Sequence, residues 1–256
     1  PIYVTTGGTL GVNDYIELFG ERNDGSFDTQ LYKQADWQLN PYNSMFSDNS
    51  FYYLVWDNTT PGLRYTNQNN NISSPPAAET YFMHTVVKSY KNVAVNGKPF
   101  RLGGANHWFA DFEDGEGLGS LTVASGGTLA IDFNTPAKYV GPGSPAGDLT
   151  VAVAGVSNDA AFLPDHAFTV QINSTTYMSE SFEGYDFNTY NSDVFLTDIG
   201  NTTVVNFEAT GGLGYLNQNT IPYAVLSYPR TFEKKKKKTF AFTLETNGQK
   251  YLEITN

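Results

Sequence analysis

The sequence predicts an all-β protein: an antiparallel β-sandwich of the jelly-roll or immunoglobulin-like type, preceded by a smaller and less regular β-rich N-terminal region. Apolar and polar residues alternate with a period of two along many short segments, and sustained helical periodicity is missing. Glycine, asparagine and proline turns separate these segments at short, even spacing. The chain also has 17 Tyr and 18 Phe but only 16% charged residues, a composition typical of extracellular all-β proteins.

Residues 118–256 carry the clearest strand pattern, and we assign them to the sandwich domain. Ile131 and Phe133, for example, share one face of a predicted strand and are expected to point into the core. The dipeptide Asn247-Gly248 is typical of a type I′ hairpin turn. The same reasoning predicts strands at residues 128–133, 149–153, 167–173, 201–209, 221–228, 240–244 and 250–255.

Residues 1–117 form the N-terminal region, whose pattern is less regular. Residues 51–56 are apolar on both faces, so we expect this strand at the centre of a sheet. Residues 77–87 fit either a strand or a short helical turn. Two further elements are predicted, a strand at residues 14–20 and a hairpin, signalled by Asn96-Gly97, at residues 93–98.

The charge balance argues against a nucleic-acid partner. The chain has 26 acidic and 15 basic residues and a formal net charge of −11, whereas phosphate binding needs a distributed basic face. Five of the basic residues form the run Lys234–Lys238. We interpret this run as a solvated loop between strands that also protects a sheet edge from pairing. The alternative is a basic tether to anionic lipid or polysaccharide.

The sequence contains few of the residue patterns that catalysis needs, and we expect no enzymatic activity from this chain. It contains no cysteine, which excludes disulfides, thiolate zinc sites, iron–sulfur clusters and a cysteine nucleophile. His84, His107 and His166 stand apart without metal-ligand spacing, so we interpret them as structural or surface residues. The sequence has neither a Gly-x-Ser-x-Gly elbow nor a phosphate-binding loop, and it indicates no cofactor.

No membrane span is expected, because no window approaches the ~18 consecutive apolar residues that a transmembrane helix needs. The first residues, Pro1-Ile2-Tyr3-Val4, lack the basic and apolar regions of a signal peptide. If the parent protein is exported, we therefore expect its signal peptide to be already absent from this sequence.

The densest acidic cluster is Asp111–Gly117. Alternate carboxylates on a loop can ligate calcium, a hard cation that takes about six to eight oxygen ligands. The spacing of this cluster does not match an EF-hand loop, so we favour an exposed turn between two strands over a calcium site. No metal site is therefore predicted.

Aromatic residues among polar neighbours raise a carbohydrate-binding hypothesis. Tyr185, Phe187 and Tyr190 lie among Asn, Asp and Ser residues, and Trp37 and Trp108 also have polar neighbours. Sugar rings stack on such side chains. A sandwich core also needs large residues, and this structural role is the more frequent one for aromatic side chains.

Several strings in the first 65 residues resemble a known protein family. They look like the segment upstream of the peptidase domain in PorU-like proteins, which are gingipain-related cysteine peptidases of the bacterial type IX secretion system. Leu18-Phe19 stands where this family commonly has an aromatic pair, and Leu63 stands where it commonly has Lys. The strings that carry the resemblance are Asp14–Gly25, Phe27–Tyr32, Asn40–Asp48, Tyr53–Trp56 and Pro61–Tyr65.

The resemblance continues through the later part of the chain. Phe112–Gly117 is similar to the short acidic link before the β-sandwich of the family, and Leu226–Arg230 is similar to its penultimate strand. The catalytic Cys and His of the family lie in a downstream caspase-like domain. No catalytic residue can therefore be assigned to this chain, which contains no Cys.

The resemblance implies a non-catalytic accessory region of an exported bacterial peptidase, at the cell surface or in the extracellular space. Its expected partners are the downstream peptidase domain of the same parent chain, secretion-system proteins or surface polysaccharide. The alternative from another functional class is a carbohydrate-binding β-sandwich that uses the aromatic residues Tyr185, Phe187 and Tyr190.

Overall fold

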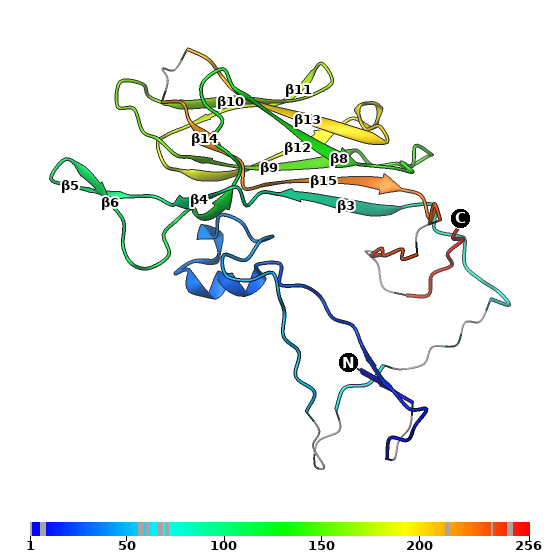
Figure 1. Cartoon of the computed structure of the whole chain (residues 1–256). Helices are drawn as coiled ribbons and strands as arrows, with labels where there is room; N and C mark the ends of the chain where they lie inside the picture. The colour runs from blue at the N-terminus through cyan, green and yellow to red at the C-terminus, as the bar shows by residue number, and fades with distance from the viewer. Residues whose placement is uncertain are drawn as a thin grey trace.

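The computed structural model confirms the predicted sandwich of antiparallel sheets (Figure 1). Two sheets lie face to face and enclose the core, and the N-terminal residues project away from them. No helix among the described residues is long and apolar enough to cross a membrane. The structure describes residues 2–5, 9–55, 59, 62–65, 69, 72–212, 216–236, 238–244 and 248–256.

The first sheet has four antiparallel strands in the order β11-β10-β13-β8. Phe168, Val170 and Ile172 of the second of these strands point into the core, as their alternation with polar residues predicts. The predicted strands at 128–133, 167–173 and 201–209 are confirmed in this sheet. Its strands are β8 (Thr128–Asn134), β10 (His166–Ile172), β11 (Thr175–Phe182) and β13 (Thr202–Ala209).

The second sheet has the order β12-β9-β15-β3, and the short strand β14 also pairs with β9. The predicted strands at 149–153 and 221–228 are confirmed here, and the ambiguous segment at 77–87 yields a strand. Its strands are β3 (Phe82–Ser89), β9 (Gly147–Gly155), β12 (Phe187–Val194), β14 (Asn219–Thr220) and β15 (Tyr223–Arg230).

One strand of this second sheet comes from the N-terminal side of residue 118. β3 pairs with β15 along its whole length, from Phe82 opposite Arg230 to Ser89 opposite Tyr223. The division of the chain into regions 1–117 and 118–256 stays a prediction. In the structure, one strand of the sandwich, β3, comes from the first of these regions.

The core lies between the inner faces of the two sheets. Large side chains from both sheets are fully buried there, and such burial stabilises the fold by ~1.5–3 kcal/mol per side chain. Tyr228 is buried too, and its hydroxyl donates to Pro136 O at 2.9 Å, which satisfies its polar end. The largest buried apolar residues are Phe133, Phe168, Phe207, Tyr228, Leu149, Ile131, Ile172, Ile199, Ile221 and Leu226.

Two short 3₁₀ helices, η1 (Ser26–Leu31) and η2 (Ala35–Trp37), lie beneath the second sheet (Figure 1). Asn40, which follows them, is buried, and its amide nitrogen lies within 3.1 Å of three backbone oxygens. These belong to Tyr90, Leu118 and Pro222. A single side chain thus joins the helical layer to three separate strand ends. A third 3₁₀ helix, η3 (Leu196–Asp198), follows β12.

Three small antiparallel pairs complete the structure. They are β1 (Ile2–Val4) with β2 (Ile16–Leu18), β4 (Val93–Asn96) with β7 (Glu116–Gly119), and β5 (Phe100–Leu102) with β6 (Ala105–His107). The predicted strand at 14–20 is therefore present but shortened to three residues.

The hairpin predicted at residues 93–98 is wrong. Val93–Asn96 pairs with Glu116–Gly119 instead of turning back on its own sequence. Gly97 does take the left-handed conformation that the turn requires, with φ of 70°. The next amide, that of Lys98, donates to Asp114 O at 2.8 Å. β7 therefore supplies the hydrogen bonds that the predicted hairpin would have made within itself. Asn96-Gly97 begins a longer loop that contains β5 and β6.

The central strand predicted at residues 51–56 is also wrong for its described part. Phe51 to Val55 form no strand, and all five side chains are exposed. Trp56 lies outside the described residues. An apolar segment is buried only where another apolar surface covers it, and no other described element covers this one.

The two predicted C-terminal strands, 240–244 and 250–255, are replaced by irregular chain. Phe240 and Phe242 pack their rings against Phe82, at 5.8 and 5.4 Å between ring centroids, instead of joining a ladder. Only isolated bridges form further on, at Tyr251 and Thr255. The predicted hairpin turn includes Asn247, which lies outside the described residues.

The described residues of the lysine run form irregular chain after β15, but this loop does not join two strands as predicted, because no strand forms at residues 240–244. Lys235 and Lys236 have φ of 49° and 58°, and the Lys236 amide donates to Asn256 Oδ1 at 3.0 Å. Lys237 lies outside the described residues.

We predict that Asn40→Ala lowers the free energy of unfolding by ~2 kcal/mol, because the carbonyls of Tyr90, Leu118 and Pro222 lose the buried donor that they share. Denaturant unfolding followed by tryptophan fluorescence measures the change. Asn92→Ala, at an exposed position next to the same strand ends, is the control and should change the free energy by less than about 0.5 kcal/mol. Equal stability of the two variants would show that Asn40 does not join the layers.

Candidate functional site

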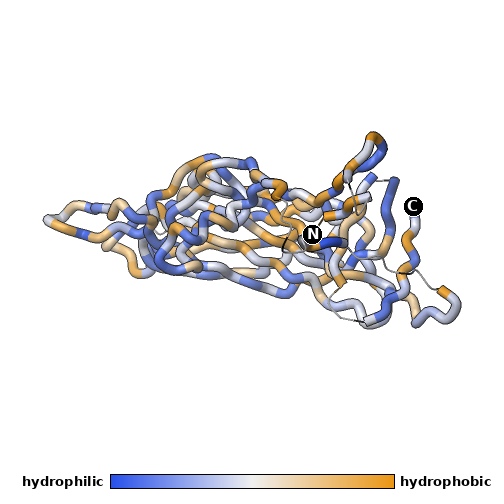
Figure 2. Tube along the Cα trace, turned by 90° about the horizontal axis from the view of Figure 1, so that it is seen from below, coloured by the Kyte–Doolittle hydropathy of each residue, from blue (hydrophilic) through white to orange (hydrophobic). Residues whose placement is uncertain are grey.

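A polar cavity of about 560 Å³ lies between the β5–β6 hairpin and the turn that joins β11 to β12. Figure 1 and Figure 2 both place this hairpin, which we call the β5–β6 arm, at one end of the molecule, away from the two termini. The side chains that line the cavity are Lys98, Arg101, Asn106, Asn158, Glu183, Tyr185 and Asp186.

The turn Glu183–Asp186 forms one wall of the cavity, and glycines fix its shape. The Asp186 amide donates to Glu183 O at 3.3 Å. Gly184 has φ of 56°, and a side chain there would collide with Asn158. Gly155 of β9 lies against the same turn, because a Cβ atom at this position would collide with Gly184 O. The turn therefore packs directly on the second sheet.

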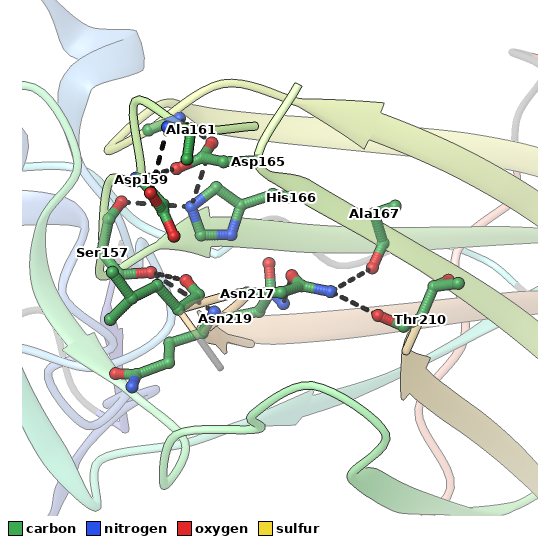
Figure 3. Close-up of polar contacts among 12 residues, drawn as sticks. Ser157, Asp159, Ala161, Asp165, His166, Ala167, Thr210, Asn217 and Asn219 are labelled. Atoms are coloured by element: carbon green, nitrogen blue, oxygen red, sulfur yellow. Dashed lines mark hydrogen bonds and ion pairs between the residues drawn. The ribbon is translucent and has the colours of Figure 1, made fainter. Parts of the chain in front are cut away.

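A buried carboxylate holds this turn from behind (Figure 3). Asp165, which is fully buried, accepts hydrogen bonds from the backbone amides of Gly184 and Asp159, each at 2.7 Å. Since hydrogen bonds to a charged acceptor are stronger than neutral ones, Asp165 anchors the cavity wall to the start of β10.

His166 also supports this turn, and its side chain is not among those that line the cavity. Its Nε2 atom lies 3.1 Å from Ser157 O and 3.6 Å from Asp165 Oδ1, and its ring stacks on Phe182 at 4.8 Å. Its Nδ1 atom is buried without a hydrogen-bond partner among the described residues. The side chain is fully buried, which matches the structural role predicted for it.

Two buried asparagines extend the same network toward β13 (Figure 3). Asn217 Nδ2 donates to Ala167 O at 3.0 Å and to Thr210 O at 2.7 Å. Asn219 Nδ2 donates in turn to Asn217 Oδ1 at 2.9 Å. These bonds satisfy buried backbone groups where loops meet the sandwich, so the network is a scaffold below the site.

The β5–β6 arm forms the opposite wall and is tied to the turn by side chains. Lys98 forms an ion pair with Asp186, and Asn106 Nδ2 donates to the Tyr185 hydroxyl at 3.1 Å. The tip of the arm is the turn Gly103-Gly104, with φ of 62° and 86°. Both contacts are partly solvated, so each stabilises the docked arm only modestly.

Burial and charge shape the electrostatics around the cavity. Burial raises the pKa of Asp114, which lies at the base of the arm, and the nearby Lys98 ammonium opposes this rise. One carboxylate oxygen of Glu183 is buried and has no hydrogen-bond partner among the described residues. Glu183 also lines the cavity, and a carboxylate is a hydrogen-bond acceptor.

A second hollow of about 220 Å³ adjoins the first and shares Tyr185 with it. Its lining includes the side chains of Val93, Val95, Trp108 and Val156, together with Asn96 and Thr122. Trp108 Nε1 donates to Gly97 O at 3.2 Å, which fixes the orientation of the indole ring.

The three aromatic residues predicted from sequence lie in different environments. Tyr185 lines both hollows. Tyr190 packs edge-on against the core residue Phe168 at 5.0 Å, and burial raises its pKa to about 12. Phe187 begins β12 and packs against Gly115. A glycan-binding role for these residues stays a prediction, and Tyr185 is the one that lines the two hollows described above.

The other candidate residues do not converge on a metal site. His84 lies 3.2 Å from the guanidinium of Arg230, His107 is exposed in β6, and Trp37 belongs to η2. The acidic cluster folds back on itself, since the Glu113 amide donates to Glu116 Oε2 at 2.9 Å. In the part of the chain that the structure describes, no group of three or more His, Asp or Glu side chains is placed to hold a metal ion.

Asn106, Asn158 and Glu183 were not predicted as site residues. Asn106 and Tyr185 are 79 positions apart in the chain, so only the fold shows that they meet. The one local signal was Gly103-Gly104, a glycine pair that marks the tip of the arm.

Comparisons with known proteins find no matching family model and no matching curated protein. Among solved structures, the chain is similar to dimeric latent PorU from Porphyromonas gingivalis, with 7% identity over 68% of this chain and a TM-score of 0.47. The match spans only 15% of that PorU chain.

Two further solved structures are similar to part of this chain. One is the CBM36-1 domain of a multidomain xylanase from the hindgut metagenome of Trinervitermes trinervoides, with 10% identity, 56% of this chain, 96% of that domain and a TM-score of 0.32. The other is CBM35 from Cellvibrio japonicus Abf62, with 13% identity, 58% of this chain, 97% of that chain and a TM-score of 0.32.

Proposed function

We propose that this chain is a non-catalytic interaction region of an exported, gingipain-related peptidase of the PorU-like type. Its N-terminal arm, defined as the described residues within 2–24, 48–55 and 62–65, docks on the peptidase domain of the same parent protein. The observation that carries the proposal is the exposure of apolar side chains along this arm.

The N-terminal arm projects from the sandwich and carries many large apolar side chains (Figure 1). Val12, Tyr53 and Val55 are more than 80% exposed, at 102%, 86% and 81%. Exposed apolar surface of this extent marks an interaction site rather than ordinary protein surface. The other large apolar residues exposed on the arm are Tyr3, Leu10, Tyr15, Leu18, Phe19, Phe51, Tyr52, Leu54, Leu63 and Tyr65.

The N-terminal arm is held together by the β1–β2 pair and by hydrogen bonds rather than by an apolar core. The Glu21 amide donates to the Tyr52 hydroxyl at 2.7 Å, and this hydroxyl donates to Glu21 O at 2.9 Å. The rings of Tyr3 and Tyr15 lie 6.1 Å apart. These contacts join the two legs of the arm but leave the apolar faces uncovered, so a partner must bury them. Each buried aromatic or aliphatic side chain contributes ~1.5–3 kcal/mol.

The chemistry of the chain supports a non-catalytic role. It has no cysteine, so it cannot supply the thiolate nucleophile of a cysteine peptidase. Three of the strings that resemble PorU-like proteins, Asp14–Gly25, Tyr53–Trp56 and Pro61–Tyr65, fall largely on this same arm. Part of the resemblance and the surface that needs a partner therefore coincide.

We expect the isolated chain to bind a catalytically inactive peptidase domain of its parent. Phe51→Ser and Tyr53→Ser should each weaken the affinity about 10-fold or more, because each removes ~1.5–3 kcal/mol of apolar burial. Calorimetric titration measures the dissociation constants. Leu163→Ser is the matched control, since Leu163 is 84% exposed on the sandwich and should leave the affinity unchanged.

Two results contradict this function. One is robust peptide hydrolysis by the isolated chain, and the other is a full-length reading frame without a Cys/His peptidase domain.

A second candidate function is glycan binding at the polar cavity. It is favoured by the position of Tyr185, whose ring borders the cavity next to the amides of Asn106 and Asn158. Ligand sites characteristically combine an aromatic surface with a few convergent polar groups.

For this candidate we expect binding on a glycan array, and a loss of about 10-fold or more in Tyr185→Ala, since stacking on an aromatic ring contributes roughly 1–2 kcal/mol. Phe195→Ala removes an exposed ring at the opposite end of β12 and should bind normally. A chain that binds no glycan, or that binds equally well without Tyr185, does not have this function.

A further inference from the structure

Tyr185 is the wall that the two hollows share. Tyr185 lines the polar cavity and, with Trp108, also lines the smaller hollow. The Tyr185 hydroxyl accepts a hydrogen bond from Asn106, and the Trp108 indole donates one to Gly97 O. We call the two adjoining hollows together the groove; Tyr185 lines both of them and Trp108 lines the second.

The charge of the polar cavity is balanced. Its ionisable side chains are two cations, Lys98 and Arg101, and two anions, Glu183 and Asp186. Lys98 and Asp186 already neutralise each other as an ion pair. The remaining two, Arg101 and Glu183, have opposite charges, so an anionic ligand would be repelled by Glu183 and a cationic ligand by Arg101. The lining therefore favours a neutral ligand.

The uncharged polar groups suit hydroxyls. The amides of Asn106 and Asn158 can each both donate and accept hydrogen bonds, and the carboxylate of Glu183, which also lines the cavity, accepts them. A hydroxyl group both donates and accepts, so vicinal hydroxyls can satisfy carboxylate and amide groups together.

The aromatic groups suit a ring with a C–H face. The faces of Tyr185 and Trp108 carry the negative side of their quadrupoles and attract such C–H groups. A hydroxyl-rich molecule with apolar C–H faces is a saccharide, and the two separated rings imply more than one sugar unit.

We propose that the groove binds a neutral oligosaccharide of at least two units. One unit lies in the polar cavity against Tyr185, where it hydrogen-bonds with Glu183 and Asn158. The next unit lies on Trp108 in the second hollow. This inference rests on the glycan-binding candidate and adds the ligand charge, the minimum length and Trp108 as a contact residue.

The test is calorimetric titration with neutral oligosaccharides of glucose, xylose, mannose and galactose, each of one to six units, and with uronic-acid oligomers of the same lengths. For the neutral series that binds, affinity should rise about 10-fold from one unit to two, the gain of one stacked ring. The uronic-acid oligomers should bind at least as weakly as a neutral single unit.

Variants separate the two halves of the groove. Trp108→Ala should abolish the gain from the second unit while it preserves the affinity for a single unit, and Trp108→Phe should restore most of the gain. Tyr185→Ala should weaken every length. Phe195→Ala is the control for loss of an exposed ring, and equal melting temperatures exclude unfolding as the cause of any loss.

The possible outcomes distinguish failure of the two-unit groove from failure of the glycan-binding function on which it rests. Glycan binding that is independent of length or of Trp108 overturns the two-unit groove but leaves the glycan-binding function standing. A preference for uronic-acid oligomers overturns the inferred neutral ligand alone. The absence of binding to all these probes overturns both.

Discussion

The pairing of β3 with β15 is the constraint on which the rest of the structure depends. Eight consecutive residue pairs, from Phe82 opposite Arg230 to Ser89 opposite Tyr223, place a strand from the first third of the chain at the edge of the second sheet. The end of this ladder brings Tyr90 and Pro222 together, and the Asn40 amide bridges both. The helical layer, the N-terminal arm and the β5–β6 arm all extend from strands and loops whose positions this ladder sets.

The molecule uses its two ends differently. At the end of the β5–β6 arm, buried polar groups such as Asp165 fix a turn, and the resulting cavity is rigid and polar. The N-terminal arm instead leaves apolar side chains such as Tyr53 exposed and has little internal packing. A preorganised cavity suits a small ligand, because little ordering entropy is lost on binding. An exposed apolar arm gains its stability from a large partner surface. The two proposed activities therefore do not compete for the same surface.

Local sequence pattern predicted the strands whose side chains alternate between core and solvent, such as β8, β10 and β13. It missed β11 and β12, because these edge strands bury few residues and their alternation is weak. It predicted a central strand at residues 51–56, because an apolar run indicates burial. Such a run does not indicate whether the same domain or another molecule covers it. Tyr185 could be singled out by its polar neighbours, whereas Asn106 and Glu183 gain their significance only from long-range contacts.

Hydrogen–deuterium exchange on the full-length parent protein and on this isolated chain tests most directly whether the N-terminal arm is an interface. If the arm docks on the peptidase domain, backbone amides in residues 9–24 and 48–55 exchange at least about 10-fold more slowly in the parent, because a docked segment must detach before it exchanges. Amides of the β5–β6 arm, residues 100–107, exchange equally in both proteins. Equal exchange of the N-terminal arm in the parent and the isolated chain would contradict the account.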